Sequence, residues 1–101
     1  MIMTDKVLNL LGLAKRAGKI TTGEELVIKT IQRQTAKFIF LANDASQNLN
    51  KKIIDKSNTY QIKTSTKYSQ EELTKAIGSE RKVLAVMDEG FAKKMENLLM
   101  Q

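Results

Sequence analysis

The chain lacks the side chains that most often perform catalysis or hold metal ions. Neither histidine nor cysteine occurs among its 101 residues. These two residue types supply the commonest general base at neutral pH, most zinc ligands and the usual activated nucleophiles. Carboxylate, lysine or tyrosine chemistry stays open, but the paired acids at 71–72 and 88–89 lie near predicted helix starts, where the helix dipole alone favours them. We therefore expect no enzyme, no cofactor and no metal site.

Net charge indicates the kind of partner. Seventeen Lys and Arg residues face eleven Asp and Glu residues, which gives a net charge of +6 and an isoelectric point near 9.7. So large a basic excess on a small chain attracts polyanions, of which RNA and DNA are the usual ones. A basic protein without an anionic partner is the plain alternative. An anionic membrane surface is a weaker one, because the sequence has no strongly basic amphipathic helix with bulky aromatic residues.

The segment Gly12-Leu-Ala-Lys-Arg-Ala-Gly18-Lys19 superficially resembles a phosphate-binding loop. Its spacing is one residue too long, no Ser or Thr follows Lys19, and a predicted helix precedes it where such a loop follows a strand. A helix C-terminus explains the segment better, since Lys15 and Arg16 suit the negative end of the helix dipole. Nucleoside triphosphate binding is therefore not expected.

A second candidate for anion binding opens with Thr22-Gly-Glu-Glu25. Thr22 as N-cap and Glu25 three residues later form a capping box, which would account for both residues structurally. A helix N-terminus also offers free backbone N–H groups to phosphate oxygens. Lys29 and Arg33 follow at successive turns on one helix face and could line a nucleic-acid backbone. Each cation alone is more simply a solvated surface residue, so only the cluster indicates binding.

A polar, cationic loop at 63–67 precedes another predicted helix. It could contact phosphates or ribose through Thr64, Ser65, Thr66 and Lys67. An ordinary polar loop is an equally good interpretation. Tyr68 could stack on a base, but it also suits a hydrophobic staple before the helix cap Ser69, and we treat it as structural.

Hydrophobic periodicity predicts the elements that position these residues. Helices are expected at 5–17, 23–33, 46–56, 69–77 and 89–100, and strands at 19–21, 37–42, 59–63 and 81–87. The second helix is expected to bury a wide apolar face made of Leu26, Val27, Ile28 and Ile31. Expected caps are Thr4 and a left-handed Gly18 for the first helix, and a capping box of Ser69 with Glu72, ended by Gly78, for the fourth. The runs 37–42 and 81–87 are typical of strands buried on both faces, which requires an α/β fold with helices on both sides of a small central sheet.

Length and hydropathy limit the architecture and the compartment. The chain, residues 1–101, suits one domain with one modest core. Its longest apolar runs, 38–42 and 83–87, are far shorter than the roughly 20 residues that cross a bilayer. No signal-peptide pattern is visible in the first residues, so a cytoplasmic protein is expected.

Five segments of the chain, taken in order, form one combined pattern: 12–19, 23–29, 36–45, 72–78 and 81–93. Together they cover nearly the whole chain and resemble the ribosomal protein L7Ae/L30e family, in particular its short YlxQ-like bacterial members. The resemblance implies a three-layer α/β/α sandwich with a small mixed central sheet. It also implies a non-catalytic protein that binds kinked RNA helices, known as kink-turns.

In that family the start of the second helix enters the widened groove at the kink and reads tandem sheared G·A pairs, while a nearby loop covers a base flipped out of the stack. This suits RNA geometry, because the deep groove of regular A-form RNA is too narrow for side chains. The resemblance assigns the helix contacts to Gly23, Glu25, Leu26 and Lys29, and Thr22 at the helix start joins them as a candidate RNA-binding residue. It assigns the covering loop to Thr64, Ser65, Thr66 and Lys67. The cations expected to neutralise phosphates are Lys19, Lys29, Arg33 and Lys67.

Two positions depart from the archaeal and eukaryotic members, which have Asn and then Glu where this chain has Glu25 and Leu26. An ionised Glu only accepts hydrogen bonds, whereas an Asn amide also donates, and a Leu side chain does neither. We expect a monomeric kink-turn binder of altered selectivity that is ribosome-associated or regulatory. The alternative is a module that keeps the fold but binds a protein, since an apolar Leu26 suits an interface core.

Overall fold

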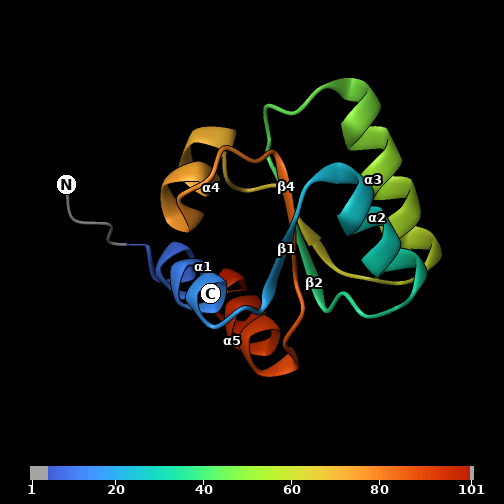
Figure 1. Cartoon of the computed structure of the whole chain (residues 1–101). Helices are drawn as coiled ribbons and strands as arrows, with labels where there is room; N and C mark the ends of the chain where they lie inside the picture. Colours follow the sequence, from blue (N-terminus) through green and yellow to red (C-terminus); the bar gives the residue numbers. More distant parts are fainter. Residues whose placement is uncertain (1–4, 101) are drawn as a thin grey trace.

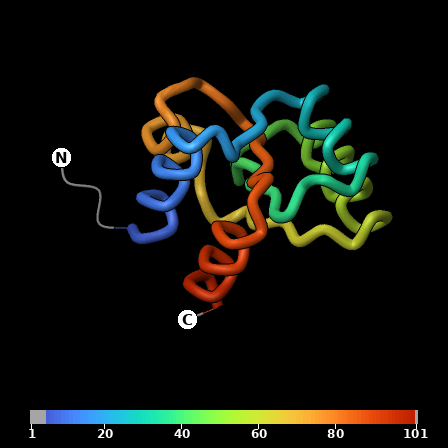
Figure 2. Tube along the Cα trace, turned by 60° about the horizontal axis from the view of Figure 1, so that its bottom comes forward, coloured from blue at the N-terminus to red at the C-terminus, as the bar shows by residue number. Residues whose placement is uncertain are grey.

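The computed structural model describes residues 5–100 of the chain. Helices and strands alternate along it: α1 (Lys6–Arg16), β1 (Ile20–Thr22), α2 (Glu24–Gln32), β2 (Phe38–Leu41), α3 (Gln47–Thr59), β3 (Thr64–Ser65), α4 (Gln70–Ile77), β4 (Val83–Val86) and α5 (Glu89–Leu99). The strands lie between two groups of helices, α1, α4 and α5 on one side and α2 and α3 on the other (Figure 1). The turned view in Figure 2 shows the same separation. None of the helices in the described part is long and apolar enough to span a membrane.

Strand directions bring several loops to one edge of the sheet. The strand order is β1-β4-β2-β3, with β4 antiparallel to both β1 and β2, and β2 parallel to β3. β1, β2 and β3 therefore run in the same direction, and β4 runs against them. Their three carboxyl ends and the start of β4 meet at one edge, which we call the upper edge after its place in Figure 1.

Alternate residues of the two central strands supply two cores. Phe38 and Phe40 of β2 pack with α1, α4 and α5, whereas Ile39 and Leu41 pack with α2 and α3. All residues of β2 and of β4 are buried, as expected for strands covered on both faces. Each buried Val, Leu, Ile or Phe side chain of these strands stabilises the fold by about 1.5–3 kcal/mol when it leaves water. The predicted α/β/α sandwich with a small mixed sheet is thus confirmed.

Asp5 and Tyr68 tie the start of α1 to the segment between β3 and α4. Asp5 is the N-cap of α1, and its carboxylate accepts hydrogen bonds from the amides of Val7 at 2.8 Å and Leu8 at 3.1 Å. The buried Tyr68 hydroxyl donates to the same carboxylate at 3.0 Å. Burial, and then the hydrogen bond and charge of Asp5, raise the pKa of Tyr68, so the phenol keeps the proton that it donates. The expected cap Thr4 lies outside the described residues.

The other predicted caps of α1 and α4 are confirmed. Ser69 and Glu72 form the capping box of α4. Gly18 and Gly78 take left-handed conformations, with φ of 72° and 77°, where α1 and α4 end. Tyr68 packs in the same core as Leu73 of α4, as a hydrophobic staple requires.

The capping box predicted at the start of the second helix is wrong. Thr22 is the last residue of β1 and pairs with Leu84 of β4, so its backbone belongs to the sheet. Gly23 is the N-cap, with φ 93° and ψ 143°, and no side chain in the described part of the chain caps the helix. A φ of this sign is open to glycine and strained for other residues. The apolar face of α2 is also narrower than predicted, because Leu26 is 55% exposed.

The strand predicted at 59–63 is wrong as well. Residue 59 still belongs to α3, and the chain then turns through Gln61 at φ 56°, a left-handed conformation that strands do not contain. The amide of Ile62 donates to the carbonyl of Ser57 at 2.8 Å and holds this turn against the end of the helix. Extended pairing begins only at Thr64 and Ser65, inside the segment predicted as a loop.

Replacing Tyr68 by Phe removes only the hydroxyl that reaches Asp5. A hydrogen bond to a charged group contributes about 1.5–3 kcal/mol, and Asp5 keeps its two amide donors, so we expect the free energy of unfolding to fall by about 1–2 kcal/mol. Urea denaturation followed by circular dichroism measures this change. Tyr60→Phe is the matched control, because Tyr60 is half-buried and its hydroxyl donates to no described residue. Equal losses in both variants would show that the contact with Asp5 adds no stability.

Candidate nucleic-acid interface

The upper edge of the sheet carries the uncapped start of α2. The amide of Gly23 donates to the carbonyl of Val83 at 3.4 Å, and its own carbonyl accepts from Val27 at 2.9 Å. The next amides, of residues 24–26, have no acceptor in the described part of the chain. Free amides at a helix start point along the axis and suit an anionic or carbonyl oxygen.

One exposed face of α2 continues from this start. The buried residues of the helix face the sheet, and Leu26, Lys29 and Arg33 are exposed on the other side. They are three and four residues apart, which places them in one row along the helix. Glu25 is exposed beside the row. Lys29 and Arg33 therefore share one face, as their spacing predicts.

A loop that the sequence did not single out lies beside the start of α2. It connects α4 to β4 and ends in Arg81 and Lys82. The carbonyl of Lys82 accepts from the amide of Ala42 at 2.8 Å, which holds the loop at the upper edge. Gly23, Arg81 and Lys82 line one shared hollow of about 510 Å³. Two adjacent cations directly before a buried strand were the signal that could have marked this loop.

The loop predicted to cover a flipped base lies on the same edge but further away. Thr64 and Ser65 form β3, and Thr66 and Lys67 follow it. β4 and β2 separate β3 from β1, so the loop lies three strand spacings, about 14 Å, from β1. The side-chain amide of Asn43 donates to the carbonyl of Lys67 at 3.1 Å and holds the loop against the end of β2. Its contact with RNA stays a prediction.

Lys19 lies toward the opposite edge of the sheet. It precedes β1, and its carbonyl accepts from the amide of Met87, just after β4, at 2.8 Å. The three residues of β1 separate it from Gly23, each adding about 3.3 Å. Lys19 thus does not share one contact point with the start of α2, and its role as a flanking phosphate contact stays a prediction.

The cations of this interface form no ion pairs within the described residues, and the Arg81 guanidinium donates to the carbonyl of Glu80 at 3.0 Å. Three ion pairs occur among the described residues: Lys52 with Glu24 at 2.8 Å, Lys75 with Glu71 at 3.3 Å, and Lys63 with Glu96. Within residues 5–100, no ion pair involves Lys19, Lys29, Arg33, Lys67, Arg81 or Lys82. The ammonium group of Lys67 lies 5.5 Å from the centre of the Tyr68 ring. No group of three or more acidic side chains in this part of the chain could hold a metal ion.

Known proteins are similar to this sequence over nearly its whole length. The model of the Ribosomal protein L7Ae/L30e/S12e/Gadd45 family matches residues 5–96. RNA-binding protein YlxQ of Enterococcus faecium is 50% identical over 94 residues, which are 93% of this chain and 91% of that protein. RNA-binding protein YlxQ of Bacillus subtilis (strain 168) is 48% identical over 91 residues, 89% of this chain and 91% of that protein.

Solved structures share the fold. A protein of unknown function from Bacillus halodurans superposes with a TM-score of 0.92 at 40% identity, over 96% of this chain and 99% of that one. The 15.5kD RNA binding protein of Giardia lamblia superposes with a TM-score of 0.76 over 91% and 86% of the two chains, and at 18% identity it shows a common fold alone. From the family match and from relatives near 50% identity, the chain belongs to the Ribosomal protein L7Ae/L30e/S12e/Gadd45 family.

Proposed function

We propose that the protein binds kink-turn-like RNA through the start of α2. The observation that carries this proposal is the uncapped helix start at Gly23, beside unpaired cations on α2 and on the loop between α4 and β4. The names of the two bacterial relatives, each an RNA-binding protein, support RNA as the partner. The net charge of +6 supports it independently.

The chemistry of the helix start suits a distorted RNA groove. The free amides of residues 24–26 favour phosphate or carbonyl oxygens, helped by the helix dipole. The exposed Glu25 carboxylate accepts hydrogen bonds and can take the amino group of a guanine in a G·A pair. Regular A-form RNA hides these base edges in a narrow groove, whereas a kink exposes them. Lys29, Arg33 and Arg81 would then neutralise phosphates on either side of the kink.

Leu26 sets the selectivity of this site. Its side chain is 55% exposed at the helix start and offers only apolar contact to a base or ribose. Hydrogen-bonded readout therefore falls to Glu25 and to the backbone. We infer a binder whose preference among kinked RNAs differs from that of relatives with two polar side chains at these positions.

The biological setting follows from the same reasoning. Family membership supports a ribosome-associated or regulatory RNA as the partner. The lack of histidine removes the commonest general base, which supports binding without catalysis. We propose that the protein acts in the cytoplasm as a monomer.

Fluorescence anisotropy with a short kink-turn RNA tests the main proposal. The control is a matched duplex in which Watson–Crick pairs replace the tandem G·A pairs. We expect the kinked RNA to bind at least about tenfold more tightly, a difference of roughly 1.4 kcal/mol. The titrations are repeated at several salt concentrations, because phosphate contacts weaken with salt and base contacts do not.

Lys29→Ala should weaken binding to every kinked RNA. Removing one phosphate contact should also flatten the plot of log affinity against log salt by about 0.7–0.9 units. Lys93→Ala is the matched control, since Lys93 is an exposed cation on α5, in the opposite helical layer. An unchanged salt dependence in Lys29→Ala would remove this residue from the interface.

Arg81→Ala and Lys67→Ala separate the two loops of the upper edge. Arg81 shares a hollow with Gly23, whereas Lys67 lies beyond β3. We therefore expect Arg81→Ala to lower affinity for kinked RNA by roughly threefold to tenfold, as loss of a close phosphate contact would, and Lys67→Ala to lower it less. A larger effect at Lys67 would place the RNA across β2 and β3 instead.

A protein-binding module is the second candidate, favoured by the exposure of Leu26. It would be supported if kinked and matched RNAs bind equally weakly and lose binding together as salt rises. The basic surface would then bind RNA only non-specifically.

A further inference from the structure

β3 is an edge strand with one side open. In its parallel ladder with β2, the amide of Ile39 donates to the carbonyl of Lys63 at 2.9 Å. The main-chain N–H and C=O groups of residues 63 and 65 therefore face β2. Those of Thr64, between them, point to the free side of the strand. No described residue bonds to these two groups. The open side of β3 thus carries one main-chain donor and one main-chain acceptor left unbonded by the described residues, both of Thr64.

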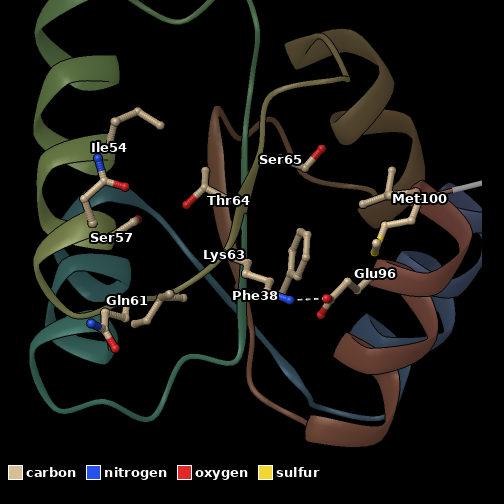
Figure 3. A pocket seen from close by; sticks show the side chains of 12 residues that line it. Phe38, Ile54, Ser57, Gln61, Lys63, Thr64, Ser65, Glu96 and Met100 are labelled. Carbon is tan, nitrogen blue, oxygen red and sulfur yellow. Dashed lines mark hydrogen bonds and ion pairs between the residues drawn. The ribbon is translucent and has the colours of Figure 1, made fainter.

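A groove of about 780 Å³ runs along this edge between α3 and α5 (Figure 3). The α3 side carries Ser57 and Gln61 beside the apolar Ile54. The α5 side carries Glu96 and ends in Leu99 and Met100, the latter 78% exposed. Lys63 pairs with Glu96 of α5, which draws its ammonium group away from Thr64. The groove therefore offers hydroxyl and amide groups on the α3 side, an apolar end at Leu99 and Met100 on the α5 side, and a main-chain edge at its base.

Two hydroxyls of the groove lack partners among the described residues. Ser57 is 1% exposed, and its Oγ makes no hydrogen bond within residues 5–100. Thr64 Oγ1 is likewise buried without a hydrogen bond to any residue that the structure describes. The two hydroxyls point toward each other across the space between α3 and β3 (Figure 3). Both oxygens are closed to solvent in this conformation, so a ligand reaches them only when the hydroxyls turn toward the groove. Because an unbonded buried polar atom is unfavourable, a ligand that then supplies a partner gains binding free energy.

We propose that this groove binds an extended polypeptide segment that adds to the sheet beside β3. The free N–H and C=O of Thr64 can both be bonded by the main chain of one extended peptide, which offers a C=O and an N–H at the matching spacing. Its side chains would alternate between the α3 and α5 sides, with Ser or Thr toward Ser57 and aliphatic residues toward Met100. The net charge of +6 favours a segment with acidic ends.

This site is independent of the RNA proposal and is tested without RNA. The full chain, labelled with nitrogen-15, is titrated with the acetylated, amidated heptapeptide Asp-Val-Thr-Val-Thr-Val-Asp. We expect the amide signals of Thr64, Ser65 and Met100 to shift, and those of Gly23 and Lys29 to stay. Two further peptides carry N-methyl groups on the valines or on the threonines. Only one of them should lose at least about tenfold in affinity, because alternate amides of an added strand face β3.

Variants of the protein test the same contacts. Thr64→Pro removes the outward N–H while leaving the amides that pair with β2, and we expect it to weaken the peptide at least about tenfold. Ser57→Ala removes one unbonded hydroxyl and should weaken the peptide about threefold without lowering the unfolding midpoint. Circular dichroism checks that each variant folds. If Thr64→Pro does not fold, the comparison of Ser57→Ala with the unchanged protein is the test.

Three outcomes would overturn the proposal. The first is that the peptide shifts none of the groove amides. The second is that both methylated peptides bind as tightly as the parent. The third is that the same signals shift when the free protein is concentrated, which would assign the groove to a second copy of the chain.

Discussion

Burial of β2 and β4 on both faces is the constraint on which the rest of the structure depends. Every residue of the two strands is buried, and alternate side chains enter opposite cores. Neither strand can therefore lie at a solvated face, and helices must cover the sheet from both sides. The remaining strands, β1 and β3, are short and lie at the two edges. The two surfaces to which we assign binding lie at these outer strands, one where β1 ends and one along the open side of β3.

At the β1 side, the chain passes from strand to helix within one residue. Thr22 is still paired in the sheet, and Gly23 turns the backbone at positive φ so that α2 can cross over β4. The geometry leaves no residue free to act as a side-chain cap, although capping usually stabilises a helix start by about 1 kcal/mol. The amides that a cap would have taken remain available to a ligand. The same turn that closes the fold therefore creates the surface to which we assign RNA binding.

The β3 side leaves main-chain groups open in a different way. Its short ladder uses the groups of residues 63 and 65, and the free groups of Thr64 face a groove between α3 and α5. The start of α2 thus offers backbone donors, and β3 offers both a donor and an acceptor. Lysine, arginine and hydroxyl side chains surround these groups. This suits a chain without histidine or cysteine, whose side chains provide charge and shape more readily than acid–base chemistry.

The order of elements, the two buried strands and most helix ends were determined by the sequence alone, because periodicity and caps such as Ser69 with Glu72 act over a few residues. Tertiary structure decided what depends on distant partners. Thr22 carries a local capping signature, but pairing with Leu84 holds it in the sheet. The third strand begins at Thr64 because β2 pairs there. The loop that ends in Arg81 and Lys82 lies nearest the start of α2 because β4 lies beside β1, and strand order is a non-local property that residue spacing does not encode.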